Sequence, residues 1–420
     1  MQPDYPPVAG MDGEDVTCRV TMKKILLIPP PSIFMGRYEP HIPLGLLSLR
    51  AMARDLGGNV DVLPLSERQR DHRFTDIGHF IKALLDGVDL SEYDIVGLST
   101  MSNSFHRSLR IARAIRRDAP GAQVLMGGPY VFGIAREVLE AFRDIDAIFV
   151  GEGERAFADL LVRRRSGRGD LTGVPGILTR GSEFVPAPAI CDLDELPLIP
   201  PDDLYQGYLS HANNQAGERI APLEVSRGCP GACAFCSTRL FWGRVVRRKS
   251  DARIMAEMRL IRDHTSLSQF ELIGDNFGSP RREFMRFCRA MAAAGGEFDW
   301  HCNLKLDHVA EEDLETIWRG GCRGFNAGVE SSSQETLNRI KKGVKIDKEV
   351  RTIRRAIARG FKVNLSFIVG FPWETTRDLD ATFRLACDLL EAGAERVMVG
   401  ALTPLPGTDL TRAYPIRFDR

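Results

Sequence analysis

Residues 226–237 read Ser226-Arg-Gly-Cys-Pro-Gly-Ala-Cys-Ala-Phe-Cys-Ser237 and hold three cysteines in a C-x3-C-x2-C spacing. Only small or apolar residues separate Cys229, Cys233 and Cys236, so the loop can point three thiolates at one soft metal centre. Iron–sulfur clusters are held by closely spaced thiolates of this kind, and three ligands leave one iron open. A closed zinc site prefers four ligands in paired spacing, and no second pair follows nearby. Zinc and chance clustering remain the alternatives.

This loop resembles the signature of the radical SAM superfamily, in which an aromatic residue, here Phe235, precedes the last cysteine. The resemblance implies a [4Fe-4S] cluster whose open iron chelates the amino and carboxylate groups of S-adenosylmethionine. Reduction of the bound cosubstrate would then give methionine and a 5'-deoxyadenosyl radical. In such enzymes the cofactors carry the chemistry, and the protein supplies geometry and a dry pocket.

Length and composition bound the other possibilities. A chain of 420 residues with 44% hydrophobic residues is too long for one ordinary domain, so we expect two. Basic and acidic residues balance at 56 each, which gives no bulk charge for nucleic acid or an anionic membrane. No apolar window approaches the roughly 18 residues of a membrane span. Nine cysteines, an odd number, argue against a secreted disulfide framework and favour a reducing, cytoplasmic location.

The N-terminal half alternates strand-like and helical patterns. Residues 1–21 are rich in Pro, Gly and Asp and are expected to be a disordered leader. Over residues 22–165, short apolar runs alternate with helical apolar spacing, which predicts a doubly wound, Rossmann-like parallel sheet. Its strands are expected at 24–28, 60–63, 93–99, 123–126 and 147–150, and its helices at 43–54, 108–117 and 137–142. Ligands of such a sheet bind beyond the carboxyl ends of its strands.

The loops at those strand ends resemble the cobalamin-binding domains. Ser99-x-Met101 and Gly127-Gly128 stand where that family has a Ser-x-Leu and a Gly-Gly that hold the nucleotide tail. Gly151-Glu-Gly-Glu154 also recurs in such domains when they are fused to radical SAM enzymes. The resemblance therefore implies cobalamin contacts from Ser99, Thr100, Gly127, Gly128, Gly151 and Glu152. A flavodoxin-like domain without a ligand is the alternative.

The cobalamin-binding family's D-x-H-x-x-G motif, which supplies a histidine ligand below the cobalt, is missing. Pro29 to Gly36 contains no histidine, and neither His41 nor the Asp71-His72 pair matches the spacing. We therefore expect cobalamin to bind with no protein histidine below the cobalt.

A polar, proline-rich stretch over residues 166–221 is expected to be a connector, with a small hairpin at 177–179 and 184–185. Over residues 222–420 the alternation resumes in about six β/α units without a closing pair. This predicts a partial (β/α)6 barrel, related to the eight-unit TIM barrel, with its site at the carboxyl ends of the strands. Its strands are expected at 269–273, 300–303, 324–328, 362–369 and 396–399, and helices at 252–263 and 281–294.

The strand ends of this second half resemble further radical SAM motifs. Gly274-Asp275 stands at the turn that receives the methionine amino group in that family, although the Gly-Gly-Glu form is absent. Gly328-Val-Glu-Ser331 resembles a G-x-E-S strand end, which implies that Glu330 and Ser331 contact S-adenosylmethionine. The segment 367–374, including Val369, resembles the G-x-P-x-E segment that lines the adenine, and 402–408 resembles the turn that closes the last strand.

Four other cysteines and two barrel residues stand apart from these motifs. Cys288, Cys302, Cys322 and Cys387 are expected to be small buried hydrophobes. His301 and Lys305 are candidates for substrate contact, because side chains alternate along a strand and these are expected to face the barrel interior.

Both halves together resemble the cobalamin-dependent radical SAM enzymes. The resemblance implies a methyltransferase acting on an unactivated carbon of a natural-product, lipid or peptide substrate, which can be a small molecule or carried on a peptide or carrier. It also implies an electron donor such as flavodoxin or ferredoxin. A cyclase or rearrangement enzyme without methyl transfer is the main alternative. A tRNA methylthiotransferase should have three further cysteines before the loop, where only Cys18 and Cys191 lie, and a cobalamin-binding sensor would need no cysteine loop.

Overall fold

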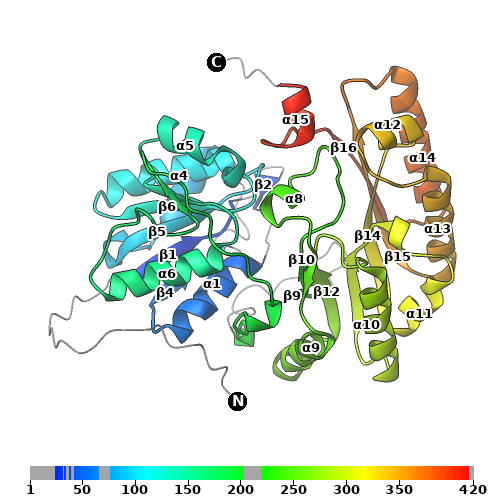
Figure 1. Cartoon of the computed structure of the whole chain (residues 1–420), viewed down its shortest axis with the longest axis horizontal. Coiled ribbons are helices and arrows are strands. Elements are labelled where there is room, and N and C mark those ends of the chain that lie inside the picture. Colours follow the sequence, from blue (N-terminus) through cyan, green and yellow to red (C-terminus); the bar gives the residue numbers. More distant parts are fainter. Residues whose placement is uncertain are drawn as a thin grey trace.

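The computed structural model describes residues 24–31, 33–34, 37–38, 42–65, 76–202 and 220–415. They form two α/β units, each built on a six-stranded sheet, which stand side by side (Figure 1). The expected leader at 1–21 lies outside the described residues. The predicted fold class, a doubly wound domain followed by an incomplete barrel, is confirmed.

The first sheet has the strand order β4-β1-β5-β6-β7-β8. All its pairs are parallel except β7 with β8. The strands are β1 (Lys24–Ile28), β4 (Val60–Val62), β5 (Tyr93–Ser99), β6 (Gln123–Gly127), β7 (Ala147–Phe149) and β8 (Ile177–Thr179). The chain passes from β1 outward to β4 and then returns to β5 on the other side. The order therefore reverses between β1 and β5, where a ligand crevice is expected.

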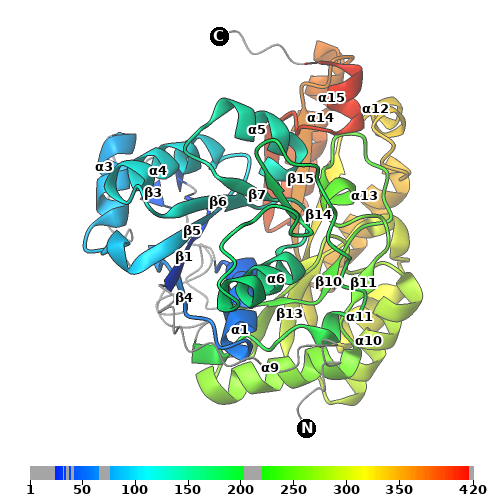
Figure 2. The ribbon, with the colours of Figure 1, turned by 60° about the vertical axis from the view of Figure 1, so that its left-hand side comes forward.

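Helices cover both faces of this sheet, and the alternation of β1 shows why. Ile25 and Leu27 pack toward α1 (Leu44–Asp55) and α6 (Gly153–Arg165). Leu26 and Ile28 pack into the opposite core, which also holds side chains of α3 (Ile77–Leu85), α4 (Phe105–Asp118) and α5 (Ala135–Ala141). A strand whose four residues after Lys24 are all apolar therefore suits a sheet with helices on both faces, as Figure 2 shows.

Strand β8 comes from the stretch expected to be a connector. Its residues pair antiparallel with β7, Ile148 lying opposite Leu178, so the first sheet extends past residue 165. The remaining short elements of this half are the pair β2 (Ile33–Phe34) and β3 (Arg37–Tyr38) and the 3-10 turns η1 (Leu90–Glu92), η2 (Val131–Ile134) and η3 (Leu193–Glu195).

The second sheet is parallel throughout, with the order β9-β12-β13-β14-β15-β16. Its strands are β9 (Ala221–Glu224), β12 (Gln269–Ile273), β13 (Asp299–Asn303), β14 (Cys322–Glu330), β15 (Lys362–Val369) and β16 (Arg396–Ala401). Its helices and turns are α8 (Thr238–Phe241), α9 (Asp251–Thr265), α10 (Arg281–Ala293), η4 (Leu306–His308), α11 (Asp313–Arg319), α12 (Gln334–Arg339), α13 (Ile346–Arg359), α14 (Thr376–Glu391) and α15 (Asp409–Ala413). Among the described residues β9 and β16 are not paired, so the barrel is open.

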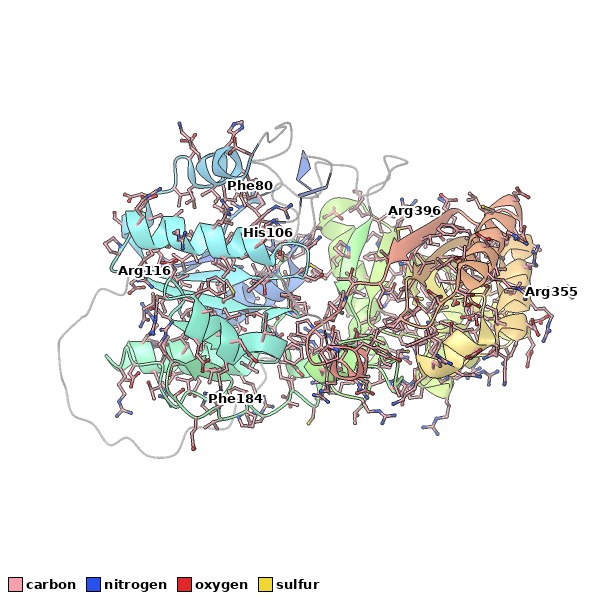
Figure 3. All side chains as sticks on the ribbon, turned by 90° about the horizontal axis from the view of Figure 1, so that it is seen from above. Phe80, His106, Arg116, Phe184, Arg355 and Arg396 are labelled. Atoms are coloured by element: carbon pink, nitrogen blue, oxygen red, sulfur yellow. The ribbon has the colours of Figure 1, made fainter. Side chains whose placement is uncertain are left out.

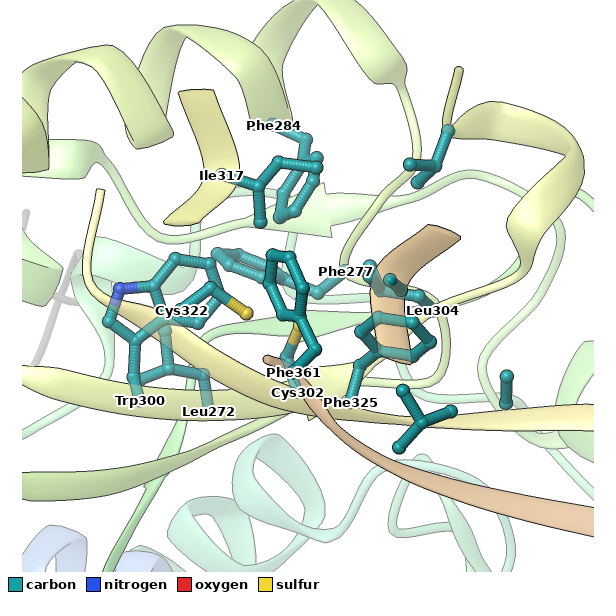
Figure 4. Close-up of a cluster of buried hydrophobic side chains, with 14 of the residues drawn as sticks. Leu272, Phe277, Phe284, Trp300, Cys302, Leu304, Ile317, Cys322, Phe325 and Phe361 are labelled. Carbon is teal, nitrogen blue, oxygen red and sulfur yellow. The ribbon is translucent and has the colours of Figure 1, made fainter. Parts of the chain in front are cut away.

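One face of this second sheet packs an aromatic core against the outer helices. Trp300 of β13 contacts Phe277, Phe284 and Phe287 edge to face, with ring centroids 5.6 to 6.3 Å apart (Figure 4). The thiols of Cys288, Cys302 and Cys322 lie buried in the same core, as expected. Cys387 is instead exposed on α14, so its expected burial is wrong.

Figure 3 places the two units at opposite ends of the molecule, with His106 and Arg116 in the first and Arg355 and Arg396 in the second. Between them lies a two-stranded ribbon, β10 (Ser226–Arg227) paired with β11 (Arg247–Arg248), which encloses the cysteine loop. None of the helices in the described part of the chain combines the length and apolarity that crossing a membrane would require.

Candidate functional site

The cysteine loop lies over the carboxyl ends of the barrel strands. Its backbone is tied on both sides, since Ala234 N–H donates to Ile340 C=O at 2.8 Å and Leu410 N–H donates to Ala234 C=O at 2.9 Å. Gly228 N–H donates to the Asp275 carboxylate at 2.9 Å. The three thiols and Phe235 line one cavity of about 330 Å³. The structure therefore brings Cys229, Cys233 and Cys236 to a common space, as their spacing predicts.

The arrangement of the thiols suits a cluster better than a single ion. In the described residues no three His, Cys, Asp or Glu side chains surround one metal-ion position. A cluster needs wider spacing, because each thiolate binds a different iron. The position that a Cβ on Gly231 would take lies 3.3 Å from Cys229 Sγ and 3.8 Å from Cys233 Sγ, so glycine keeps the space between these sulfurs free.

Burial changes the titration of two thiols in this loop. Removal from water raises the pKa of both Cys229 and Cys233. Thiols with raised pKa hold their protons at neutral pH, and a metal centre that binds them must displace those protons. The fit of a cluster here therefore rests on three soft donors in a protected loop.

A ladder of amides crosses the floor of the same cavity. Asn303, Asn326 and Asn364 are register partners on β13, β14 and β15. Asn364 Nδ2 donates to Asn326 Oδ1, and Asn326 Nδ2 donates to Asn303 Oδ1, both at 3.0 Å. Asn303 Nδ2 donates to Gly274 C=O at 3.0 Å, and Asn326 Nδ2 also donates to Glu271 Oε1 at 3.1 Å. The sequence analysis missed this ladder.

A buried ion pair closes one side of the cavity. Lys342 Nζ donates to Glu330 Oε1 at 2.8 Å, and both side chains are less than a tenth exposed. Burial lowers the pKa of Lys342, but the carboxylates of Glu330 and Glu349 outweigh it and leave the pKa raised. Glu349, on α13, accepts no hydrogen bond from any described residue at either carboxyl oxygen. Burial raises the pKa of Glu349 to about 7, against the opposing effect of Lys342.

The residues expected to contact S-adenosylmethionine divide into two groups. Phe235, Asp275 and Glu330 line the cysteine cavity. Gly274 lies just behind it, where an added Cβ would come 2.1 Å from Ser226 Oγ.

The other two predicted residues do not line this cavity. Ser331 is fully buried and receives a hydrogen bond from Ser333 N–H at 3.2 Å, while Val369 C=O accepts from Leu402 N–H at 2.8 Å. Through these hydrogen bonds Ser331 and Val369 fix the backbone at the ends of β14 and β15.

Asp275 is engaged within the protein. Its carboxylate accepts from Gly228 N–H and, at 3.2 Å, from Thr238 Oγ1. Burial raises the pKa of Asp275, and the two hydrogen bonds oppose that shift. The side chain therefore holds the cysteine loop to the end of β12. Of the two substrate candidates, Lys305 lines the cavity and pairs with Asp307 at 2.7 Å, whereas His301 packs beside Gly324 and does not line the cavity.

The first domain holds a cavity of its own, the first cavity, which has a volume of about 380 Å³ and lies at the carboxyl ends of β1, β5, β6 and β7, as the reversal of strand order predicts. Its walls are mostly apolar and include Leu27, Leu125 and Phe149. The segment after the cysteine loop supplies Phe241 and Trp242 to the same cavity. A wide apolar slot of this kind suits a flat, bulky ligand.

Five of the six expected cobalamin contacts line the first cavity: Ser99, Gly127, Gly128, Gly151 and Glu152. Thr100 does not line it, since its buried hydroxyl donates to Gly127 C=O at 2.8 Å beneath the cavity. Gly128 has φ +105°, and an added Cβ would come 2.4 Å from Thr100 C=O. Only glycine fits there, so the backbone itself forms the wall.

Histidine is absent from the described residues that line this cavity. His41 and the Asp71-His72 pair lie outside the described residues. The expectation of cobalamin without a lower histidine therefore stays a prediction.

A cluster of buried charges joins the two domains beside the first cavity. Arg227 donates to Glu224 of β9 and to Glu152 and Glu154 of the first domain, at 2.5 to 3.0 Å. Burial lowers the pKa of Arg227, but the carboxylates, Glu224 first and then Glu154, outweigh it, so the pKa is raised and the group stays charged. The sequence analysis assigned Glu152 to a ligand and did not anticipate this pairing.

Two family descriptions match the chain. Residues 36–161 match the B12 binding domain, and residues 223–386 match the Radical SAM superfamily. The first match covers β4, β5, β6 and β7, and the second covers β12, β13, β14 and β15 together with the cysteine loop.

Relatives named as methyltransferases and relatives named as cyclases match this chain at similar sequence identity. The uncharacterized methyltransferase PH0819 of Pyrococcus horikoshii is 28% identical over 93% of this chain and 82% of its own length. The cobalamin-dependent radical SAM methyltransferase TokK of Streptomyces tokunonensis is 28% identical over 79% of this chain and 49% of its own. The anaerobic magnesium-protoporphyrin IX monomethyl ester cyclase of Rubrivivax gelatinosus is 27% identical over 76% and 58%. The chain thus spans about half of the length of TokK and of this cyclase.

A solved structure shares the whole arrangement. The radical S-adenosylmethionine methyltransferase TsrM from Kitasatospora setae, with cobalamin and a [4Fe-4S] cluster bound, superposes with a TM-score of 0.71. The alignment covers 93% of this chain and 74% of TsrM at 18% identity, a likeness of fold. The chain thus carries a B12-binding domain followed by a radical SAM domain, the combination expected of the cobalamin-dependent radical SAM enzymes that it resembles.

Proposed function

We propose that the chain is a cobalamin-dependent radical SAM methyltransferase that acts on an unactivated carbon. The observation that carries this proposal is the pair of cavities, one lined by three thiols and one by glycine-rich strand ends, in two domains that the ion pairs of Arg227 hold together. Its relatives PH0819 and TokK are named as methyltransferases, which supports the same outcome. The division into first domain, connector and second domain is part of the proposal, with the first domain extended to β8.

In the cysteine cavity, we assign Cys229, Cys233 and Cys236 to a [4Fe-4S] cluster. Phe235 and Glu330 line the space beside them, where S-adenosylmethionine would bind to the open iron. When bound, the cluster would supply the electron that cleaves S-adenosylmethionine, and cobalamin would carry the methyl group. The chain's own part is to fix the loop through Asp275 and to keep the site largely dry, since the thiols lie in a partly enclosed cavity.

In the first cavity, we assign cobalamin to the slot between Gly127-Gly128 and Gly151-Glu152. The apolar wall and the close backbone at Gly128 support a flat ligand, and Ser99 faces it from the end of β5. Electron paramagnetic resonance of the protein with cob(II)alamin should show no nitrogen splitting from a protein histidine. A nitrogen signal that disappears in His41→Ala or His72→Ala would contradict this assignment.

The experiment that tests methyl transfer counts products from S-adenosylmethionine. A methyltransferase of this kind should form S-adenosylhomocysteine and 5'-deoxyadenosine in about equal amounts, because one molecule supplies the methyl group and another the radical. Deuterated methyl groups of S-adenosylmethionine should appear in the product. Turnover that forms 5'-deoxyadenosine, but no S-adenosylhomocysteine and no deuterium-labelled product, would favour a cyclase. The Rubrivivax gelatinosus relative is named as one.

The substrate is proposed to be a small molecule, free or held on a carrier or peptide, and the electron donor a flavodoxin or ferredoxin. Lys305 and the amide ladder offer the polar contacts near the cysteine loop. We also propose a reducing, cytoplasmic setting, because a cluster bound by three cysteines requires reduced thiols.

A further inference from the structure

The cysteine loop begins directly after a buried arginine. Arg227 ends β10, and Cys229 follows two residues later. The Arg227 side chain is only 2% exposed and lines the first cavity, on the side away from the thiols. A guanidinium is retained in such a place only if its donors are matched by carboxylates, since a buried unpaired charge is strongly unfavourable.

The matching carboxylates come from both domains. Glu224 of β9 accepts from Nε and Nη2 at 3.0 and 2.9 Å, which fixes the guanidinium to the barrel. Glu152, at the end of the loop after β7, and Glu154, in the first turn of α6, accept from Nη1 and Nη2 at 3.0 and 2.5 Å. The planar, forked donor group of arginine can hold three carboxylates at once, which the single ammonium of lysine cannot do in the same geometry.

A second arginine completes the arrangement. Arg247 of β11 is the register partner of Arg227 in the ribbon, and directly opposite residues of an antiparallel pair point to the same side. Arg247 Nη2 pairs with Glu152 at 2.6 Å and its Nη1 donates to Ile190 C=O at 2.6 Å. Both strands that enclose the cysteine loop are therefore attached to one glutamate of the first domain.

The attachment extends to the segment after the third cysteine. The Arg227 guanidinium lies over the Trp242 ring at 4.8 Å, and Arg247 donates to Trp242 C=O at 3.2 Å. The backbone at Gly228 packs closely against the ribbon, since its φ is +92° and an added Cβ would come 2.3 Å from Val245 C=O. A shift of Arg227 would thus pass into the backbone of the first cysteine.

We infer that Arg227, with Glu152, Glu154 and Arg247, is a positioning residue that fixes the distance and orientation between the two cofactor cavities. This inference rests on the proposed function, which requires a methyl carrier in one domain to face a radical formed in the other. Neither family resemblance assigns this task to the glutamates after β7, of which the sequence analysis had placed only Glu152 at the ligand.

The test compares Arg227→Gln and Glu154→Gln with the parent by hydrogen–deuterium exchange of the full-length protein without cofactors. Exchange in residues 226–248 and 150–157 should become about tenfold faster in Arg227→Gln, and less so in Glu154→Gln, while β1, β5, β14 and β15 keep their protection. The matched control is Arg164→Gln, which breaks an ion pair with Asp94 inside the first domain and should leave both segments unchanged. Unchanged exchange in those segments in both variants, or faster exchange spread evenly over all strands of Glu154→Gln, would overturn the inference.

A second measurement uses protein reconstituted with iron, sulfide and cob(II)alamin. If the two sites are held at a fixed separation, the reduced cluster should alter the spin relaxation of the cobalt signal in the parent and in Arg164→Gln, and this effect should change in Arg227→Gln. Identical relaxation in all three proteins would count against a positioning role. A parent protein that takes up neither cofactor would instead contradict the proposed function. The exchange experiment needs no cofactor, so it would still decide whether the ion pairs of Arg227 hold the cysteine loop.

Discussion

The two cavities of this protein are built on different principles. The first is made of backbone and apolar side chains, with Gly127 and Gly128 bringing the chain close to the ligand space. The second is made of polar side chains that bind one another, among them the amide ladder and the Lys342–Glu330 pair. Both lie beyond the carboxyl ends of parallel strands, so the fold fixes where a cavity forms and the side chains decide what it can hold.

This difference has a physical consequence. A cavity walled by backbone tolerates no added atoms, whereas a cavity walled by a hydrogen-bond network tolerates no removed partner. The first cavity should therefore lose affinity for its ligand when a methyl group is added to its wall. The cysteine cavity should do so when an amide or a thiol is removed.

The largest effect is expected from the thiols. Replacing Cys229, Cys233 and Cys236 together by alanine should abolish the cluster, because these are the donors that share the cavity. Iron and sulfide content after anaerobic reconstitution measures this. The matched control is alanine at Cys191 and Cys387, which are exposed, do not line the cysteine cavity and should leave the iron content unchanged. Full iron content in the triple variant would show that the assignment is wrong.

The next effect should separate the two cavities. Gly128→Val adds atoms where a Cβ already comes 2.4 Å from Thr100 C=O, and Gly231→Val adds them between two sulfurs. We expect Gly128→Val to weaken hydroxocobalamin binding on the order of a hundredfold, about 3 kcal/mol, through strain at a left-handed position and the clash. Its iron content should stay normal.

Gly231→Val should do the reverse and lose iron while it keeps cobalamin affinity. Equilibrium dialysis and iron analysis of both variants provide the comparison. Loss of both cofactors from either variant would mean that the cavities are not independent.

The sequence predicted the parts of these cavities that depend on local order. The cysteine spacing and the apolar runs of β1, β12 and β15 lie within a few residues, so pattern alone located them. Pairings between distant residues were not visible. Nothing local showed that β8 would join the first sheet or that Glu152 would meet Arg227.

The sequence does contain a weak indication of the amide ladder. Asn303, Asn326 and Asn364 each stand at a strand position that alternates with buried apolar residues. Their contact depends on the register of β13, β14 and β15, which a single sequence does not specify.

A third prediction breaks this ladder. Asn326→Leu removes the partner of Asn303, Asn364 and Glu271 at once and should destabilise the protein by about 2 kcal/mol, since buried polar groups lose their hydrogen bonds. Urea unfolding followed by tryptophan fluorescence measures the shift. Asn338→Ala, at an exposed amide on α12, is the control and should change the midpoint little. An unchanged midpoint in Asn326→Leu would show that water replaces the ladder at no cost.

The smallest effect depends on pH. Burial raises the pKa of Glu349 from its ordinary 4.5 to about 7, so the folded state binds this proton more tightly than the unfolded state. The carboxyl therefore lowers stability as pH rises from about 4.5 through 7 and has no such effect below that window. Glu349→Gln should stabilise the protein by about 1–2 kcal/mol more at pH 8 than at pH 5.5. Unfolding at the two pH values measures this, and an equal difference at both would contradict it.

The arginine and glutamate cluster between the domains also limits how this protein can be recombined. A chimera that joined the barrel to the first domain of another enzyme would bury Arg227 and Arg247 against a foreign loop. Unless that loop supplied carboxylates at the positions of Glu152 and Glu154, Arg247 would lose its counter-charge inside the protein and Arg227 would keep only that of Glu224. The two domains are thus inherited as a matched pair, and the loop after β7 must change together with the ribbon that carries the cysteines.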